Sequence, residues 1–434
     1  MKPPKSRKAE LAHNATGGEK PHAETAESAE FKMTEFGPIP VDWEVKRFDD
    51  TFEHVSSKPF QLQSSEYRDG GRFQVVDQGQ MEIVGYTDDD KKLFHVPGGG
   101  VIIFGDHTRI IKFRESDFVV GADGTHLLIG KNDCTRFLFY VLQQLDIPNL
   151  GYSRHFKYVK ESRYAVPSTL AEQRRIAEAL SDIDELILAL GKLIEKKRNI
   201  KTGAMQELLG MRNAECGMRN VPRRRLPGFS GAWVEKRFDE CFEIIGNNTY
   251  ARECMCDDCG GVANIHYGDV LIRYGSVLDC SRTAVPSLIN SIICRTDRLS
   301  DGDVIIADTA EDETVGKAIE IRGLKGRRVV SGLHTIACRP RLDFAPGWLG
   351  YYINSSAFHD QLLPLITGTK VSSISKAGLR TTILNVPTLA EQKAIAAVLS
   401  DMDAEIAALE AKRTKYESIK QGMMQELLTG KTRF

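Results

Sequence analysis

The sequence predicts an α+β protein in which two strand-rich globular blocks alternate with two long helices. Two observations lead to this prediction. Two helical segments match each other at a constant offset, and a shorter pair of matching segments opens the two blocks. The sequences between the matched segments are unrelated, so similar ends enclose divergent middles, which indicates an internal repeat.

The helical segments carry the strongest match. Leu170-Ala-Glu-Gln173 recurs 219 positions later as Leu389-Ala-Glu-Gln392, and Met205-Gln-Glu-Leu-Leu209 recurs at the same offset as Met424-Gln-Glu-Leu-Leu428. Upstream, Trp43-Glu-Val-Lys-Arg-Phe-Asp49 resembles the segment that begins at Trp233, at an offset of 190. The helices therefore match without a gap, whereas the two blocks differ in length.

Hydrophobic residues in both helices follow the 4-3-4-3 spacing of a heptad seam, which is typical of helices that supercoil around a partner. An isolated helix of about 40 residues is marginal in water, so the expected partner is the other copy; the alternative is that each helix packs on its own block. Thr169 and Thr388 stand where an N-cap belongs. Lys197, Lys201, Arg413 and Lys420 occupy would-be core positions. The expected interface residues are Ile176, Leu180, Ile183, Ile187, Leu190, Ile395, Leu399, Met402, Ile406 and Leu409.

The domain boundaries follow from these matches and from composition. The first residues are polar and poor in bulky apolar groups, which predicts a disordered tail over 1–35. Short β-type runs at 73–76, 101–104, 110–113, 303–307 and 329–330 lie in the two blocks. We expect globular blocks at 36–166 and 233–386, helices at 167–210 and 387–430, and a linker at 211–232.

Bulk composition excludes several classes of protein. No apolar run approaches the ~18 residues of a membrane span, so the chain is expected to be cytoplasmic and to have no membrane partner. A net charge of −1 argues against a surface coated in positive charge, so binding to nucleic acid would depend on local basic patches. Nucleotide-binding glycine loops and zinc-protease motifs are absent, and no nuclease or methyltransferase motif was found. We therefore expect no catalytic residues and no cofactor.

The nine cysteines are expected to be free thiols. The cluster Cys254-Met-Cys-Asp-Asp-Cys259 raises the possibility of zinc, with Cys241 or His266 as a fourth ligand. This spacing lacks a second matched pair, so three thiols in an irregular loop are favoured and no metal site is predicted.

Glycine-flanked polar loops are the candidates for binding DNA. Arginine and lysine can pair with guanine edges, asparagine with adenine, and serine, threonine and lysine can contact phosphates. Each loop taken alone could also be an ordinary solvated loop. Two of the loops lie equivalently, each shortly before the Val-Pro that opens a helix. The candidate residues are His107, Arg109, Arg154, His155, Lys157, His266, Tyr267, Thr369, Lys370, Ser373 and Lys376.

With these residues in view, the chain resembles the DNA specificity (S) subunit of Type I restriction-modification systems over residues 40–430. The resemblance is carried by the two heptad helices and their Met-Gln-Glu-Leu-Leu endings, together with several motifs. These motifs are Val166-Pro-Ser-Thr-Leu-Ala-Glu-Gln173, Val386-Pro-Thr-Leu-Ala-Glu-Gln392, Gly105-Asp-His-Thr-Arg109, Gly121-Ala-Asp-Gly-Thr-His126 and Ser331-Gly-Leu-His-Thr335.

The resemblance implies two target recognition domains, each reading half of a bipartite, asymmetric DNA sequence, with two conserved helices packed antiparallel as a spacer. It also implies two methyltransferase subunits and two ATP-dependent restriction subunits as partners, which hold the S-adenosylmethionine, ATP and Mg²⁺ sites. Two competing hypotheses stay open: a protein-interaction scaffold without a DNA role, and a fused methylase or nuclease with cryptic motifs.

Overall fold

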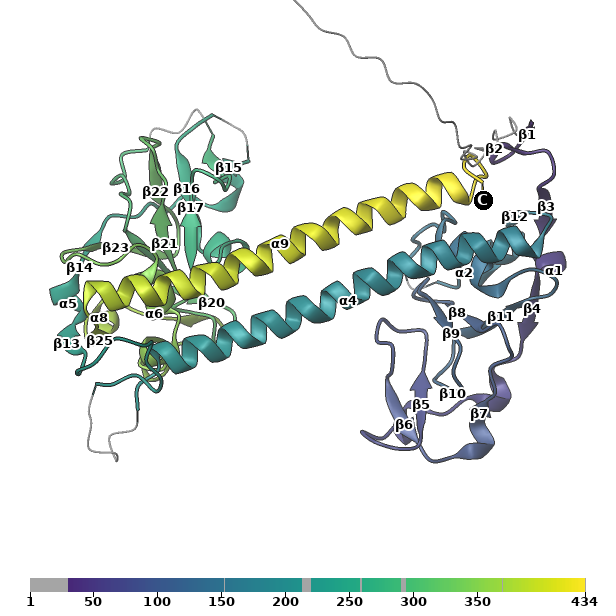
Figure 1. The fold of residues 1–434 in the computed structure, drawn as a ribbon, viewed down its shortest axis with the longest axis horizontal. Helices are drawn as coiled ribbons and strands as arrows, with labels where there is room; N and C mark the ends of the chain where they lie inside the picture. The colour runs from purple at the N-terminus through teal and green to yellow at the C-terminus, as the bar shows by residue number, and fades with distance from the viewer. Residues whose placement is uncertain are drawn as a thin grey trace, which may run out of the picture. The chain divides into compact units, whose positions relative to one another are not determined.

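The computed structural model describes residues 30–151, 153–212, 220–257, 260–289, 294–368 and 370–433. The chain divides into two compact units. Unit 1 comprises the residues up to Glu185 together with 417–434, and unit 2 comprises 186–416. Two long helices, α4 (Leu170–Leu209) and α9 (Leu389–Leu427), each contribute residues to both units (Figure 1).

The described residues of unit 1 form two four-stranded sheets and two strand pairs. Its first sheet has the order β4 (Phe52–Val55), β11 (Thr125–Gly130), β8 (Val101–Gly105), β9 (Ile111–Arg114). Its second sheet has the order β6 (Gly85–Thr87), β5 (Phe73–Val76), β10 (Phe118–Val120), β7 (Leu93–Phe94). The pairs are β1 (Phe31–Thr34) with β2 (Gly37–Pro40), and β3 (Glu44–Arg47) with β12 (Arg163–Val166). The short helices are α1 (Phe48–Thr51), α2 (Thr135–Gln143) and α3 (Phe156–Glu161).

In the described part of unit 2, the strands form a five-stranded sheet, a four-stranded sheet and two strand pairs. The five-stranded sheet has the order β14 (Phe242–Ile245), β23 (Thr335–Pro340), β19 (Val304–Ala307), β21 (Ala318–Arg322), β17 (Val277–Asp279). The other sheet has the order β15 (Met255–Cys256), β18 (Ser287–Leu288), β16 (Ala263–Ile265), β22 (Val329–Ser331). The pairs are β13 (Val234–Arg237) with β25 (Ile383–Val386), and β20 (Thr309–Ala310) with β24 (Ser372–Ser373). The short helices are α5 (Phe238–Cys241), α6 (Trp348–Ile353), α7 (Ser356–His359) and α8 (Lys376–Leu379).

The two units share a topology that their sequences do not reveal. In unit 1, β8 pairs antiparallel with β9 and β11, and β5 runs parallel to β10. In unit 2, β19 pairs antiparallel with β21 and β23, and β16 runs parallel to β22. All residues of β8 and β19 are buried, as expected of short apolar central strands. The divergent blocks are thus variants of one scaffold.

Both long helices begin directly after the threonines expected as N-caps and are anchored by the glutamine of their Leu-Ala-Glu-Gln motif. The hydroxyls of Thr169 and Thr388 accept hydrogen bonds from the backbone three residues on, at 3.3 Å in each case. The Gln173 side chain accepts a hydrogen bond from the Cys134 backbone N–H at 2.7 Å, next to the start of α2. Gln392 accepts one from the Ala345 N–H at 2.9 Å, ahead of α6. Each buried glutamine therefore ties its helix to the adjacent block.

The predicted helix seam has two roles. Ile176 and Leu180 lie in the core of unit 1, and Ile395 and Leu399 lie in the core of unit 2. These first positions pack on the globular part of their unit, which corrects the expectation that the whole seam faces the other helix. Further along, Ile183, Leu190 and Ile406 are buried, and Ile187, Met402 and Leu409 are half-buried.

The helix ends complete the cores. Met424, Leu427 and Leu428 at the end of α9 belong to the core of unit 1, and Leu208 and Leu209 at the end of α4 belong to that of unit 2. Each core is therefore assembled from the start of one long helix and the end of the other.

Ion pairs between the helices show that they run antiparallel. In unit 2, Lys197 pairs with Glu405 at 2.6 Å, whereas Lys201 pairs with Asp403 at 2.5 Å, so the partner number falls as the lysine number rises. Carboxylates of the opposite helix thus neutralise these lysines at would-be core positions. Arg413 is exposed.

Other expectations have mixed outcomes. Residues 1–29 of the predicted tail lie outside the described residues. The predicted end of the tail at residue 35 is too late, because strand β1 begins at Phe31. Among the described residues no helix is long and apolar enough to span a membrane.

Free thiols are found at Cys134, Cys241, Cys254, Cys280, Cys294 and Cys338, whereas the expectation is wrong for Cys256, which is disulfide-bonded.

The cysteine cluster is only partly described, because Cys259 lies outside the described residues. Cys241, considered as a fourth ligand, is buried in the core of unit 2. Over the described ranges, no group of three or more His, Cys, Asp or Glu side chains is arranged to hold a metal ion.

Candidate nucleic-acid interface

In unit 1, Asp106 joins the two candidate loops. Its carbonyl accepts hydrogen bonds from the backbone N–H and from Nδ1 of His155, both at 2.9 Å. Its carboxylate accepts one from the Phe156 N–H at 2.8 Å. The loop after β8 and the loop ahead of α3 are therefore held together by contacts that their composition did not predict.

The loop after β8 has a constrained backbone. Arg109 adopts φ +60°, a conformation that is uncommon for residues other than glycine. Its N–H closes the turn on the Gly105 carbonyl at 2.8 Å, and its guanidinium donates to the Ile147 carbonyl at 2.9 Å. The hydrogen bond to Ile147 thus fixes the orientation of the half-buried Arg109 side chain.

Gln78 is a structural centre of this surface that sequence inspection missed. Its side-chain oxygen Oε1 accepts a hydrogen bond from the His107 N–H at 3.0 Å, and its side-chain Nε2 donates to the backbone carbonyl of Asp123 at 2.7 Å. The Thr108 hydroxyl also donates to the Gln78 backbone carbonyl at 2.5 Å. A single side chain thereby connects the loops after β5, β8 and β10. No sequence signal marks a lone glutamine after a short strand as such a centre.

The remaining candidates in unit 1 differ in exposure. Arg154 and Lys157 are exposed, and His107 is half-buried with Nδ1 3.2 Å from the Ser153 carbonyl. His155 is fully buried, so it positions the loop and does not present its ring to solvent. The exposed cations therefore stand on a segment that buried contacts hold in place.

A histidine pair lies next to Asp106. The rings of His54 and His126 share a hydrogen bond at 3.1 Å, and Nε2 of His126 is 3.6 Å from the Asp106 carboxylate. Burial lowers the pKa of His126 below its ordinary value, although Asp106 acts in the opposite direction. Burial, and then the neighbouring His126, lower the pKa of His54. Both rings therefore favour the neutral form near pH 7.

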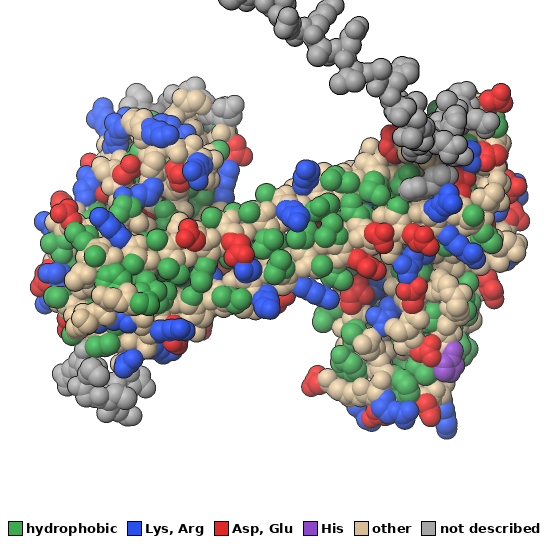
Figure 2. All heavy atoms as spheres, viewed as in Figure 1, with side chains coloured by type: hydrophobic (Ala, Val, Ile, Leu, Met, Phe, Trp, Pro, Cys, Tyr) green, Lys and Arg blue, Asp and Glu red, His purple; other side chains and the backbone are tan. Residues whose placement is uncertain are grey.

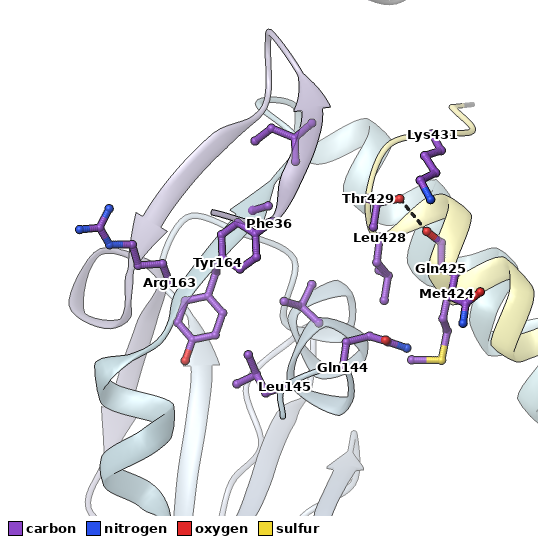
Figure 3. A pocket seen from close by; sticks show the side chains of 13 residues that line it. Phe36, Gln144, Leu145, Arg163, Tyr164, Met424, Gln425, Leu428, Thr429 and Lys431 are labelled. Atoms are coloured by element: carbon purple, nitrogen blue, oxygen red, sulfur yellow. Dashed lines mark hydrogen bonds between the residues drawn. The ribbon is translucent and has the colours of Figure 1, made fainter. Parts of the chain in front are cut away.

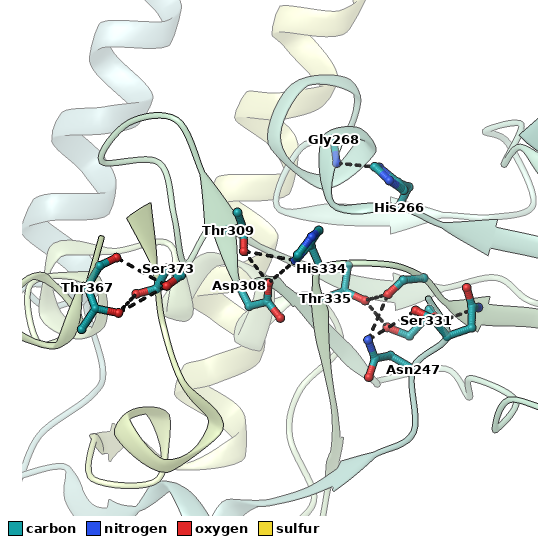
Figure 4. A network of polar contacts seen from close by, with 12 residues as sticks. Asn247, His266, Gly268, Asp308, Thr309, Ser331, His334, Thr335, Thr367 and Ser373 are labelled. Carbon is teal, nitrogen blue, oxygen red and sulfur yellow. Dashed lines mark hydrogen bonds and ion pairs between the residues drawn. The ribbon is translucent and has the colours of Figure 1, made fainter. Parts of the chain in front are cut away.

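Unit 2 repeats the junction around Asp308 (Figure 4). The Asp308 N–H donates to the His334 carbonyl at 3.1 Å, as the Asp106 N–H donates to Gly124 at 2.7 Å. His334 and Gly124 both have positive φ, +54° and +88°. The Asp308 carbonyl accepts from the Ile374 N–H at 2.9 Å, as that of Asp106 does from His155.

The candidate loop ahead of α8 is tied to this junction. Thr367 and Ser373 exchange backbone hydrogen bonds at 2.8 and 2.9 Å, and strand β24 pairs with β20. Lys370 and Lys376 are exposed and Ser373 is half-buried, while Thr369 lies outside the described residues. Lys376 opens α8 as Lys157 stands in the first turn of α3. The equivalence inferred from the sequence is thus present in the structure.

The last candidates of unit 2 follow β16. His266 is 7% exposed and accepts a hydrogen bond from the Gly268 N–H at 3.2 Å. Tyr267 is half-buried and lies edge-on to His334, with ring centroids 5.3 Å apart. Buried Asn264 accepts from the Asn248 amide at 2.8 Å, so it supports the loops and does not face solvent. Of these residues, Tyr267 and His334 are the more accessible.

A cavity of about 310 Å³ in unit 1 lies apart from these loops, beside the end of α9 (Figure 3). Apolar groups such as Phe36, Leu145 and Leu428 line much of it, and Arg163 and Lys431 add positive charge. It lies where the β1–β2 hairpin, α2 and α9 meet.

Helix α4 also exposes hydrophobic side chains. Leu186, Leu193 and Ile200 recur every seven residues and are 36%, 38% and 47% exposed. Residues seven apart lie on one face of a helix, so these three form a line beside the buried seam. Figure 2 shows hydrophobic side chains gathered along the visible face of the helices. Such an exposed apolar line is typical of a protein-binding surface.

Comparison with known proteins agrees with this architecture. Residues 40–200 match the family model described as the Type I restriction modification DNA specificity domain. The chain is 24% identical over 421 residues to the Type I restriction enzyme MjaVIII specificity subunit of Methanocaldococcus jannaschii, which covers 91% of this chain and 94% of the relative.

Two solved structures share the fold. The S subunit of a Type I restriction-modification system from M. genitalium superposes with a TM-score of 0.56 at 14% identity, over 89% of this chain and 96% of that one. A chain from a study of complex assembly and conformational transition of the type I R-M system gives a TM-score of 0.51 at 16% identity, over 91% and 99%. Residues 40–200 therefore carry a Type I restriction modification DNA specificity domain, and the chain as a whole is similar to the DNA specificity subunits of Type I restriction-modification systems.

Proposed function

We propose that this chain is a non-catalytic, sequence-specific DNA-binding subunit in which each recognition domain reads one half of a bipartite, asymmetric target. In this proposal the recognition domains are residues 36–166, extended at the N-terminal side by strand β1 (Phe31–Thr34), and residues 233–386, and the linker is 211–232. The observation that carries the proposal is the repeated aspartate junction. Asp106 and Asp308 each hold together two polar loops, and exposed cations follow on the second loop.

The exposed cations suit contacts with DNA phosphates, and the loop ends suit base contacts. Arg154 and Lys157 in unit 1, and Lys370 and Lys376 in unit 2, supply positive charge on loops that the junction holds rigid. Rigid placement lowers the entropy lost on binding. Arg109 and Tyr267 lie on the neighbouring loops and are the candidates for contacts with base edges.

The helices are proposed to dock two methyltransferase subunits, and two restriction subunits join for cleavage. Chemistry that needs S-adenosylmethionine, ATP and Mg²⁺ belongs to those partners. The exposed line of Leu186, Leu193 and Ile200 supports this assignment, because an apolar stripe on a helix needs a covering surface. The helices are further proposed to set the spacing between the two half-sites.

The test combines methylation mapping with binding. Expressing the chain with its methyltransferase partner and sequencing methylated adenines should yield one bipartite motif. Absence of any motif, with no binding to duplex DNA by the complex, would favour the interaction scaffold. The double variant Arg154→Ala/Lys157→Ala should bind DNA more weakly and reduce the dependence of log affinity on log salt by about 2. Lys91→Ala, an exposed lysine outside both loops, should preserve that slope.

A further inference from the structure

Two polar triads occupy equivalent positions of the repeat. In unit 1, the Tyr140 hydroxyl donates to Asp184 at 3.0 Å, and Lys420 pairs with the other oxygen of the same carboxylate at 2.7 Å. The Lys420 ammonium also lies 5.5 Å from the centre of the Tyr140 ring. Helix α2 supplies the tyrosine, α4 the aspartate and α9 the lysine.

Unit 2 has the same triad with the two long helices exchanged. The Tyr351 hydroxyl donates to Asp403 at 2.8 Å, and Lys201 pairs with the other oxygen at 2.5 Å. The Lys201 ammonium lies 5.3 Å from the centre of the Tyr351 ring. Here α6 supplies the tyrosine, α9 the aspartate and α4 the lysine. The lysines and the aspartates are each related by the 219-residue offset of the repeat.

We infer that the triads Tyr140–Asp184–Lys420 and Tyr351–Asp403–Lys201 set the axial register between α4 and α9 and the seating of each recognition domain on them. They are thereby positioning residues that restrict the subunit to one half-site spacing. This inference rests on the proposed function, because spacing has meaning only if both domains read DNA.

Between the helix ends that the two cores hold, apolar contacts alone set the register weakly. A seam of leucine and isoleucine can slide by one turn, about 5.4 Å, and still bury similar side chains. A carboxylate with a fixed tyrosine donor and a single lysine partner loses both contacts in such a slip. Both tyrosines are only 2% exposed. A slip that moves the aspartate away would leave the hydroxyl of a buried tyrosine without its acceptor, which is costly. Asp184 and Asp403 are 35% and 39% exposed, so the triads are partly buried, and their buried members are the tyrosines. Buried polar side chains are a known means of specifying register in paired helices.

The chain offers a matched control. Arg198 of α4 pairs with Glu410 of α9 at 2.5 Å, but the two side chains are 63% and 44% exposed. Lys201 and Lys420 are 17% and 20% exposed in their pairs. An exposed pair contributes little and is screened by salt. Removing Arg198 therefore removes an interhelical ion pair without removing a triad.

The experiment measures spacing selectivity. The motif of the wild-type complex supplies two half-sites, and a duplex series then varies the spacer one base pair at a time. The full chain with its methyltransferase partner is assayed by competition binding. Wild type should prefer its own spacer by about tenfold over neighbours one base pair longer or shorter. The variant Lys201→Met/Lys420→Met should lower this preference to about threefold or less.

Two further variants separate positioning from general stability. Lys201→Arg/Lys420→Arg keeps both charges and should keep the wild-type preference, as should Arg198→Met. A folded methionine double variant that keeps the tenfold preference overturns the inference. If that variant does not fold, Tyr140→Phe/Tyr351→Phe replaces it, since only two hydroxyls are removed, and retained preference there is equally decisive. A wild-type complex without a two-part target would instead overturn the proposed function.

Discussion

Glu172 and Arg433 form a two-point ion pair although 261 residues separate them. The two Glu172 oxygens lie 2.9 and 2.7 Å from guanidinium nitrogens of Arg433, which also contacts both Asp42 oxygens at 2.9 and 2.7 Å. In unit 2, Arg225 binds both oxygens of Glu391 at 2.8 Å. The glutamate of the repeated motif thus binds an arginine that follows the end of the other long helix.

Replacing Arg433 with methionine should destabilise unit 1. The Glu172 side chain is 8% exposed, and its charge would lose its partner, at a cost of about 2–3 kcal/mol in the free energy of unfolding. Urea denaturation at pH 7 measures this loss. The hydrogen bond from Arg433 lowers the pKa of Asp42. The Asp42–Arg433 contact therefore adds to the free energy of unfolding above pH 3.8, the ordinary pKa of Asp42, and this contribution is lost as the pH falls below that value.

Arg237→Met is the control for this prediction. Arg237 pairs with Asp239 at the surface, where the side chains are 66% and 48% exposed. Its loss should change the free energy of unfolding by less than about 1 kcal/mol. Equal effects of the two variants would contradict the structural role given to Arg433.

Gln78→Ala should weaken DNA binding more than it weakens the fold. The variant removes the contacts with His107 and Asp123 that connect two loops, while the strand cores stay intact. We expect a loss of about tenfold in affinity, corresponding to one or two hydrogen bonds. Competition binding measures it, with the exposed Gln80→Ala as control. Unchanged affinity in Gln78→Ala would show that the loops hold their shape without this side chain.

Unit 1 should lose stability on mild acidification. Because burial lowers the pKa of His126, the unfolded chain binds a proton more readily than the folded one below the ordinary value of 6.5. The contribution of His126 to the free energy of unfolding is therefore fully present above pH 6.5 and decreases as the pH falls below it. Asp106 opposes the shift, whereas Lys160 and Arg154 reinforce it. Thermal unfolding from pH 7.5 to 5.5 should show a weaker pH dependence in His126→Gln than in wild type. Identical profiles would argue against this assignment.

Leu193→Lys should block docking of the methyltransferase subunits. The substitution places a charge within the exposed line of Leu186, Leu193 and Ile200, and burying that charge against a partner is costly. Co-purification should fall while thermal unfolding of the isolated chain stays unchanged. Leu188→Lys is the control, because Leu188 is 59% exposed on the same helix but lies off the line. If both variants bind the partner normally, the docking surface lies elsewhere.

Much of the candidate interface was predictable in position but not in role. The loops around Arg109, Arg154 and Lys376 were identified from their composition, and the structure places each next to its aspartate junction. His155 was selected for its residue type, yet its ring is buried. Gln78 carries no local signal, since its importance comes from contacts with residues 29 and 45 positions away.

Local patterns were enough to predict the repeat, the two long helices and their N-caps, because heptad periodicity and capping depend on residues within a few positions of each other. Only the folded chain shows that the divergent blocks share one scaffold and that Leu428 and Arg433 complete unit 1 rather than unit 2. It also paired Lys201 and Lys420 with the aspartates of the opposite helix. These outcomes depend on strand pairing and burial between segments far apart in the chain, which no local pattern specifies.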